Sequence, residues 1–295
     1  MTIKIVILGC TGFLGGSLFR HFKKTAFQVE GYSSSTLDLA LPSSIDKLCE
    51  ILDENTILIV ATRNRVEEQH HLNGFNRNIL MNQHVAACLE RKRIKKCLYF
   101  SSDGVYGEPA TNLNRAETDP IQPTSLYGLS SFIGENLLTI MAEKQGTPVL
   151  TLRLCRVYGP GDLEISSYGP SQFITTMLKE NKIYLFGAGE EKRAYLFIHD
   201  LVKIVEKLIF SDITGAFNVG MGTSFSFKEM VGSLRKISNK EPEIVTLNRT
   251  RNNIHLGFNI EKLMGVLPDF KFTCMEKGLG KTYDSISKII STLKT

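Results

Sequence analysis

The segment IKIVILGCTGFLG (residues 3–15) determines the fold predicted for this chain of 295 residues. Residues 3–8 form an uninterrupted apolar run, which is typical of a strand buried on both faces of a parallel sheet. Gly9, Gly12 and Gly15 follow with the spacing G-x-x-G-x-x-G, and helical apolar spacing continues after them. Such a turn lets backbone N–H groups approach a pyrophosphate at the positive end of a helix. The segment therefore predicts a dinucleotide site; the alternative is an ordinary glycine-rich loop.

The first half of the chain alternates between apolar runs and segments with helical spacing. Predicted strands are residues 3–8, 27–32, 57–61, 96–101 and 149–155, and predicted helices are residues 11–24, 43–52, 75–91 and 125–144. Continuous apolar strands separated by helices indicate a parallel sheet covered on both faces. The predicted fold class is α/β, a Rossmann-type doubly wound parallel sheet, and we expect this domain to span residues 1–155.

The second half of the chain is less regular. We expect residues 156–295 to form mainly a smaller α/β lobe that binds the substrate, with about 199–220 returning to the main sheet. Predicted strands there are residues 183–186 and 195–198, and predicted helices are residues 200–210, 226–236 and 276–293.

Composition excludes several classes of function. The net charge of +5 is compatible with a phosphorylated small substrate but is too weak to argue for nucleic acid. Apolar runs are too short to span a bilayer, and six cysteines without a C-x-x-C pair favour buried thiols in a reducing cytoplasm. Histidine spacing gives no metal pattern. The basic clusters RKRIKK (91–96) and NRTRNN (248–253) are interpreted mainly as solvated surface.

Further motifs follow the glycine turn in a fixed order. They are YFSSDGVYGE (99–108), SLYGLSSFIGEN (125–136), RLCRVYGPGD (153–162), FGAGEEKRAYLFIHDLV (186–202) and FNVGMGTSFSFKEM (217–230). Together they resemble the extended short-chain dehydrogenase/reductase family, the NAD(P)-dependent sugar-nucleotide epimerases, dehydratases and reductases. The resemblance covers nearly the whole chain and implies an NAD(P) cofactor and a nucleotide-sugar substrate.

The resemblance also implies the catalytic residues. Ser102 matches the hydroxyl that bonds to the reacting oxygen, and Tyr127 matches the acid–base group that exchanges a proton with it. In the family a lysine four residues later eases loss of the tyrosine proton from a phenol whose ordinary pKa is about 10. Ser131 stands in that position. A cation about 6 Å away is worth about 2.8 kcal/mol, so its loss slows the chemical step on the order of a hundredfold.

The glycine turn and the resemblance also give the cofactor-binding residues. Ser33 and Ser34 stand at the end of the second strand where an acid would repel a 2′-phosphate, so the sequence leans toward NADP, although no arginine is present locally. Asp38 either contacts the adenine edge or is a turn residue before Pro42. The full predicted set is Gly9, Thr11, Gly12, Phe13, Leu14, Gly15, Ser33, Ser34, Asp38, Leu39, Ala61 and Tyr127.

The predicted substrate-binding residues are Ser102, Asp103, Arg156 and Arg193. Arg193 matches the family arginine that binds the nucleotide diphosphate, a task suited to a guanidinium group. Arg156 replaces a family asparagine. It either compensates for the missing lysine, binds the substrate diphosphate, or is a surface or structural arginine.

The sequence therefore predicts an NAD(P)-dependent sugar-nucleotide oxidoreductase or epimerase. A 4-keto reductase or epimerase is favoured over a dehydratase, because no acid–base pair of carboxylates precedes Tyr127. The alternative is a catalytically impaired binding module with a regulatory or partner role, supported by Ser131, which is either natural or engineered. The resemblance also implies a homodimer through helices 75–91 and 125–144, the second with an apolar side formed by Leu126, Leu129, Ile133, Leu137 and Ile140.

Overall fold

A computed structural model describes residues 2–63, 71–107, 111–162, 169–249 and 253–292. Contacts within the chain divide it into two units. The first comprises Met1–Pro109, Thr118–Leu154 and Val202–Phe217, and the second comprises Ala110–Glu117, Cys155–Leu201 and Asn218–Thr295. The predicted first domain, residues 1–155, contains residues 110–117, which the structure places in the second unit. They belong there because strand β5 (Asn112–Arg115) pairs with strand β13 (Leu256–Phe258).

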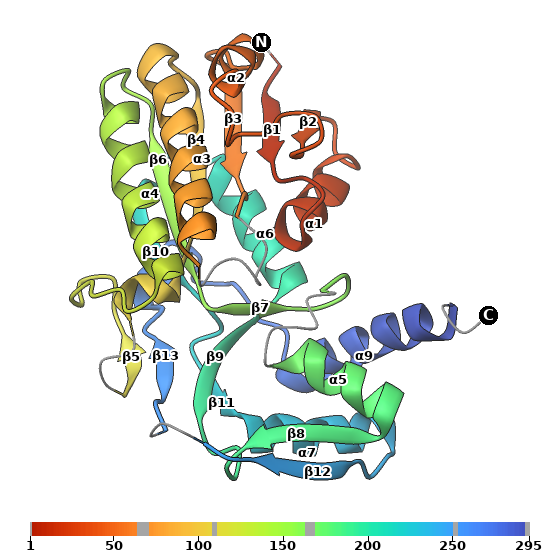
Figure 1. The fold of residues 1–295 in the computed structure, drawn as a ribbon. Coiled ribbons are helices and arrows are strands. Elements are labelled where there is room, and N and C mark those ends of the chain that lie inside the picture. The colour runs from red at the N-terminus through yellow and green to blue at the C-terminus, as the bar shows by residue number, and fades with distance from the viewer. Residues whose placement is uncertain (1, 64–70, 108–110, 163–168, 250–252, 293–295) are drawn as a thin grey trace. The chain divides into compact units, whose positions relative to one another are not determined.

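The first unit is built on a six-stranded sheet with the order β10-β6-β4-β3-β1-β2 (Figure 1). Its pairs β1–β2, β1–β3, β3–β4 and β4–β6 are parallel. The predicted doubly wound α/β fold is confirmed. The strand order reverses direction at β1, and ligands of such sheets bind at the carboxyl ends of the strands at this point. The strands are β1 (Lys4–Leu8), β2 (Gln28–Tyr32), β3 (Thr56–Val60), β4 (Lys96–Ser102), β6 (Val149–Leu154) and β10 (Gly215–Val219).

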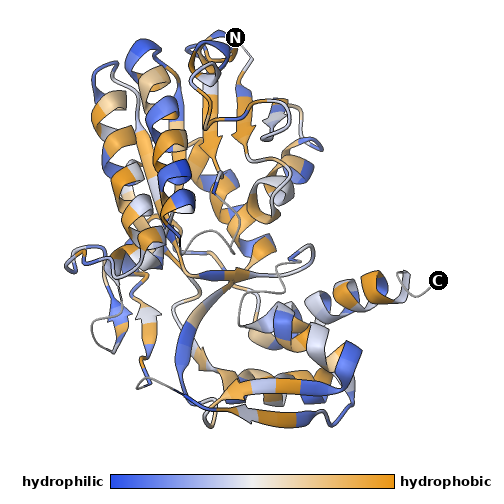
Figure 2. Ribbon diagram, viewed as in Figure 1, coloured by the Kyte–Doolittle hydropathy of each residue, from blue (hydrophilic) through white to orange (hydrophobic). Residues whose placement is uncertain are grey.

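Helices cover both faces of this sheet. On one face, Leu48 of α2, Val85 of α3 and Leu138 of α4 pack in a core with Val6 and Leu58 of the strands. Each such fully buried side chain contributes about 1.5–3 kcal/mol, and Figure 2 shows the hydrophobic residues concentrated along these strands. On the other face lie α1 and α6. The helices are α1 (Phe13–Phe22), α2 (Ser44–Ile51), α3 (Leu72–Arg91), α4 (Leu126–Glu143) and α6 (Ile198–Ile209).

Helix α4 buries its small and polar side and exposes part of its apolar side. Leu129 is 36% exposed and Ile140 is 54% exposed, whereas Ser131 and Glu135 are buried. The close approach of α3 and α4, which run side by side in Figure 1, requires this arrangement. A Cβ added at Gly134 would lie 2.3 Å from the hydroxyl of Tyr99. Of the predicted apolar side, Leu129 and Ile140 are therefore exposed, whereas Leu137 packs against the core.

The second unit contains shorter sheets. The main one has the order β11-β9-β13-β5, with β7 also paired to β9, and β8 pairs in parallel with β12. The remaining strands are β7 (Arg156–Tyr158), β8 (Lys182–Phe186), β9 (Lys192–Phe197), β11 (Ser224–Ser226) and β12 (Glu243–Leu247). The helices are α5 (Pro170–Glu180), α7 (Phe227–Ser238), α8 (Glu261–Val266) and α9 (Met275–Thr292); residue 293, the predicted end of α9, lies outside the described residues.

Candidate active site

The glycine turn lies at the point where the strand order reverses. Gly9, at the end of β1, has a positive φ of 86°, and a Cβ there would lie 2.7 Å from the carbonyl oxygen of Ala61 after β3. A Cβ at Gly15 would lie 2.3 Å from the carbonyl oxygen of Gly9. Both positions therefore require glycine, and the first turn of α1 packs directly against the strand end.

The N-terminus of α1 remains open to an anion. Its N-cap is Gly12, which provides no side-chain hydrogen bond to the first turn, and both Thr11 and Gly12 are exposed. Phe13 and Leu14 are half-buried and begin the helix. A helix end of this kind binds a phosphate through backbone N–H groups and the helix dipole. The turn thus fits the pyrophosphate of a dinucleotide cofactor.

A tight turn follows β2. The Leu37 N–H donates to the carbonyl oxygen of Ser33 at 2.8 Å, and the hydroxyls of Ser33 and Ser35 are hydrogen-bonded at 2.8 Å. Ser33 is buried, whereas Ser34 is exposed. The carbonyl oxygen of Tyr32 accepts from the backbone N–H of Gly9 at 2.7 Å. The serine turn and the glycine turn are therefore adjacent.

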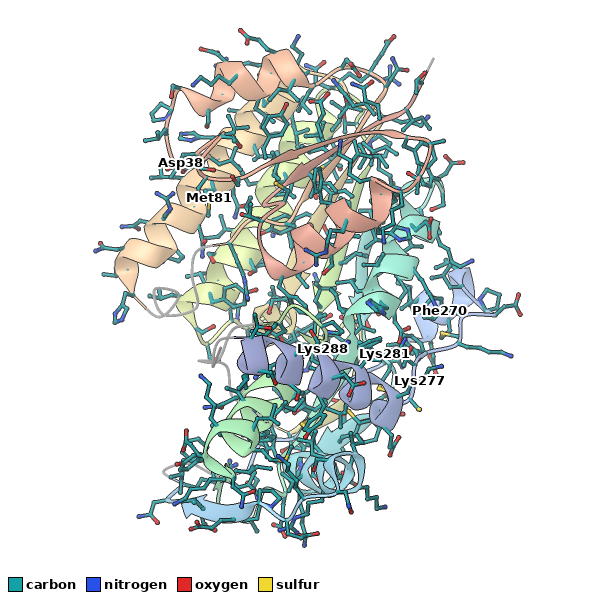
Figure 3. The ribbon with its side chains drawn as sticks, turned by 90° about the vertical axis from the view of Figure 1, so that its right-hand side faces the viewer. Asp38, Met81, Phe270, Lys277, Lys281 and Lys288 are labelled. Atoms are coloured by element: carbon teal, nitrogen blue, oxygen red, sulfur yellow. The ribbon has the colours of Figure 1, made fainter. Side chains whose placement is uncertain are left out.

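Asp38 has both a turn contact and an ion pair. Its Oδ1 accepts from the Ala40 N–H at 3.1 Å and from Arg77 Nη2 at 2.8 Å. Burial opposes the charge, but the Arg77 hydrogen bond, the Ala40 N–H and the Arg77 charge hold the pKa of Asp38 below its ordinary value. Figure 3 labels Asp38 beside α3, the helix that carries Arg77. Leu39 packs in the core, and its carbonyl oxygen contacts His84 Nδ1 at 2.7 Å.

Ser102 and Tyr127 are brought together by two glycines. Ser102 ends β4 and caps a 3₁₀ helix (η2, Asp103–Tyr106), accepting from the Gly104 N–H at 3.0 Å and donating to Asp103 Oδ1 at 3.0 Å. A Cβ at Gly128, next to Tyr127, would lie 2.1 Å from the carbonyl oxygen of Gly104. The two backbones therefore touch, and the predicted catalytic hydroxyls come from adjoining segments.

The hydroxyl of Ser131 forms a hydrogen bond within its own helix, α4. Its hydroxyl donates to the carbonyl oxygen of Tyr127 at 3.0 Å, and that of Ser130 donates to the same oxygen at 2.9 Å. Tyr127 itself is half-buried. Burial and the neighbouring Tyr127 raise the pKa of Tyr99, which lies beneath this turn of α4. Ser131 thus supplies neither charge nor reach toward the phenol.

A buried polar network connects the segments that carry Ser102 and Tyr127. Glu135 of α4 accepts from the Ser101 hydroxyl and from Arg153 of β6, whose Nη2 lies 2.9 Å from Oε2. Arg153 Nη1 donates to the hydroxyl of Tyr106 at 2.9 Å, and its guanidinium lies over the Tyr106 ring. Burial opposes the Arg153 charge, but Glu135 and Tyr106 together raise its pKa. The network fixes β4, η2, α4 and β6 relative to one another.

The two predicted substrate arginines belong to the second unit. Arg156 lies on β7 and pairs in register with Tyr195, and a Cβ at Gly169 would lie 2.9 Å from Arg156 Nη1. Arg193 lies on β9 and donates to Glu191, which also accepts from Arg249. Arg249 belongs to the basic segment interpreted as solvated surface, yet its side chain is only 17% exposed. That interpretation is wrong for Arg249.

The described residues contain no cluster of histidine, cysteine, aspartate and glutamate able to hold a metal ion. Among the described helices, none combines the length and the apolar character needed to cross a bilayer.

A family model named NAD dependent epimerase/dehydratase family matches residues 5–220. The chain belongs to this family. The match includes the glycine turn, Ser102, Tyr127 and Arg193, so the resemblance noted in the sequence is confirmed, and the family's dependence on NAD agrees with the fit of the glycine turn.

The chain is similar to two sugar-nucleotide enzymes from other organisms. The chain is 24% identical to dTDP-4-dehydro-6-deoxyglucose reductase of Escherichia coli, over 98% of this chain and 97% of that protein. It is 25% identical to a trifunctional UDP-glucose 4,6-dehydratase/UDP-4-keto-6-deoxy-D-glucose 3,5-epimerase/UDP-4-keto-L-rhamnose-reductase of Arabidopsis thaliana, over 84% of this chain and 38% of that longer protein.

Two solved structures share the fold. UDP-glucose 4-epimerase of Thermotoga maritima with UDP-glucose matches with a TM-score of 0.86 and 19% identity, over 98% of this chain and 100% of that one. The NAD complex of UDP-glucose 4-epimerase from Thermus thermophilus matches with a TM-score of 0.83 and 20% identity, over 96% of this chain and 98% of that one.

Proposed function

We propose that this protein reduces the 4-keto group of a nucleotide sugar, with Tyr127 as the proton donor. The observation that carries the proposal is the contact of Gly104 with Gly128, which joins the segments of Ser102 and Tyr127. NAD(P)H supplies the hydride when bound. Ser102 turns its hydroxyl from Asp103 to the reacting oxygen, and Tyr127 delivers a proton to that oxygen, so the ketone becomes an alcohol.

Reduction is favoured because it consumes a protonated phenol. The family lysine eases loss of that proton, and a proton donor depends on this help less than a base does. The reductase of Escherichia coli, which aligns over nearly the full length of both chains, also supports this assignment. An epimerase is the second candidate, because the same hydroxyl pair can serve oxidation and reduction in turn.

The test is an assay of the full-length chain with dTDP- and UDP-linked 4-keto-6-deoxy sugars. A reductase consumes one NAD(P)H for each product, whereas an epimerase converts substrate without net loss of NAD(P)H. We expect Tyr127→Phe to reduce turnover at least a hundredfold, while Tyr184→Phe, which removes a hydroxyl bonded to Glu180, leaves it unchanged. Cofactor binding without turnover of any substrate would favour the binding module.

We also propose NADP as the preferred cofactor. Support comes from Ser33 and Ser34 in place of an acid and from Arg77, which reaches Asp38 beyond the serine turn. No arginine lies near the serine turn in the sequence, but Arg77 of α3, 39 residues after Asp38, lies beside it in the fold. A guanidinium group there can bind a 2′-phosphate.

We propose that the protein is a homodimer and acts in the cytoplasm. Exposed apolar side chains on α3 and α4 support the dimer: Leu72, Leu80, Leu129 and Ile140. Ile140→Asp is expected to convert the dimer to a monomer in analytical ultracentrifugation. The six free cysteines support a reducing compartment.

A further inference from the structure

Two buried thiols lie in contact in the first unit. Cys49 is in the last turn of α2 and Cys88 is in the last turn of α3, 39 residues later in the sequence. Their Sγ atoms are 2.8 Å apart. This is only about 0.8 Å more than the length of an S–S bond. Both cysteines are free, so the structure shows the dithiol form of the pair.

The contact between α2 and α3 holds the two sulfurs together. Cys49 and Cys88 belong to one hydrophobic core with the buried side chains on either side of them: Leu48, Leu52, Val85 and Leu89. At the surface, Arg91 of α3 pairs with Asp46 of α2 at 3.1 Å. Close packing keeps such a contact in place, so a bond between the sulfurs requires little movement of either helix.

The two cysteines differ in their access to solvent. Cys49 is 8% exposed and Cys88 is 0% exposed. Burial raises the pKa of Cys88, the hydrogen bond and the charge of Cys49 add to this rise, and the charges of Lys92 and Arg91 oppose it. Only a thiolate attacks a disulfide. Cys49 is therefore suited to meet an oxidant from outside, and Cys88 is suited to react afterwards within the core.

We propose that Cys49 and Cys88 form a redox modification site whose oxidant is a low-molecular-weight disulfide. The Cys49 thiolate attacks the oxidant, so that a bond forms between Cys49 Sγ and one sulfur, the S–S bond of the oxidant breaks, and one thiolate leaves. The Cys88 thiolate then attacks Cys49 Sγ and releases the second thiolate. The two protein thiols lose two electrons and two protons, and the oxidant becomes two thiols. The product is a disulfide that joins α2 to α3.

The modification is reversible and changes stability. A low-molecular-weight thiol reverses both steps, which agrees with a reducing compartment, where protein disulfides are transient. The cross-link closes a loop between residues 39 positions apart and thereby restricts the unfolded chain. We expect the oxidised protein to melt at a temperature higher by roughly 4–8 °C than the reduced protein.

The test is incubation of the folded, full-length protein with oxidised glutathione in a mildly alkaline buffer, followed by unfolding and alkylation of the remaining thiols. We expect the intact mass to show the loss of two hydrogen atoms, peptide mapping to find residues 49 and 88 cross-linked, and dithiothreitol to restore both thiols. Cys274→Ser is the control, because Cys274 is an exposed cysteine. It should remove any glutathione bound at that position and leave the cross-link unchanged.

Cys49→Ser separates the pair from the other thiols. In this variant, oxidised glutathione should neither cross-link Cys88 nor raise the melting temperature. If the variant does not fold, peptide mapping of the wild type decides alone, because it locates the bond. A wild type in which both thiols are still alkylated, a glutathione adduct on Cys49 with Cys88 free, or equal cross-linking of other cysteine pairs would each overturn the inference. A cross-linked protein that melts no higher than the reduced one would overturn the effect on stability.

Discussion

Two clusters of arginine and carboxylate, one in each unit, differ in how deeply their arginines are buried. In the first unit, Glu135 and Arg153 pair one to one, and their side chains are 9% and 7% exposed. Ser101 and Tyr106 bind the remaining polar atoms of the pair. In the second unit, Glu191 meets two arginines that remain partly exposed.

The difference shows which cluster contributes more to the stability of its unit. A matched and fully hydrogen-bonded pair needs nothing from outside, and it fixes the segments that carry Ser102 and Tyr127. In the cluster of the second unit, Arg249 Nε is buried without a hydrogen-bond acceptor among the described residues. Breaking each cluster at its carboxylate should therefore cost more stability in the first unit, where the arginine is buried, than in the second, where both arginines are partly exposed.

The largest effect is expected for Glu135→Gln. The variant leaves Arg153 buried without its counter-charge, and breaking a buried pair in this way costs about 3–5 kcal/mol. Urea unfolding measures the loss. Glu191→Gln should lose much less, because its two arginines keep some contact with water. The control Glu143→Gln, on an exposed residue of the same helix, should be neutral. Equal losses at Glu135 and Glu191 would show that the comparison is mistaken.

These clusters also show where sequence patterns stop being informative. The glycine turn and the strands β1 and β3 are predictable because their signals are local: Gly9 with Gly12 and Gly15, and apolar runs buried on both faces. Glu135 and Arg153 are 18 residues apart, and Glu191 and Arg249 are 58 residues apart. No local pattern pairs such residues, so their contacts follow only from the folded chain.

Two elements that the sequence does not predict, β5 and α5, also lack a local pattern that identifies them. Strand β5 has the sequence NLNR, of which only Arg115 is buried, and its pairing with β13 rather than its own pattern makes it a strand. Helix α5 begins at Pro170 after Gly169, a pair that resembles a loop although proline also fits the first turn of a helix. The cluster 91–96 looks solvated, yet Lys96 is buried at the start of β4.

Lys96 extends the comparison to a buried cation that contacts carbonyl oxygens rather than a carboxylate. Its Nζ donates to the carbonyl oxygens of Leu208 at 2.9 Å and Ser211 at 2.6 Å. Burial lowers the pKa of Lys96 to about 8, although the charge of Asp212 acts to raise it. Between about pH 8 and the unfolded value near 10.4, only the unfolded chain binds this proton, so stability rises with pH.

The expected gain over this window is on the order of 3 kcal/mol for the wild type relative to Lys96→Met. Urea unfolding of both proteins at several pH values measures it, since other titrating groups cancel in the difference. The neutral amine retains two N–H groups, so it can keep both carbonyl contacts. A difference that stays constant with pH would show that Lys96 does not titrate in this range.

Ser131→Lys tests whether the first unit lacks a cation for its chemistry. The charge of Arg153 is already matched by Glu135, so that arginine does not replace the family lysine. We expect the variant to raise turnover up to about a hundredfold, as NAD(P)H consumption would show. Ser130→Ala, which removes the neighbouring hydroxyl bonded to the Tyr127 carbonyl, should leave turnover within about threefold. No gain in Ser131→Lys would indicate that the protein has compensated elsewhere or does not turn over.

The smallest effect concerns an exposed pair, Arg77 with Asp38, whose side chains are 38% and 24% exposed. Solvent screens this pair, so Arg77→Gln should change stability by less than about 1 kcal/mol. If Arg77 contacts a 2′-phosphate, the same variant weakens NADPH binding about tenfold and leaves NADH binding unchanged. Fluorescence titration with both nucleotides measures the ratio. Arg91→Gln is the control, because Arg91 lies on the same helix as Arg77 and forms an exposed pair with Asp46 of α2. An equal loss for NADPH and NADH would place Arg77 at the adenosine rather than at its phosphate.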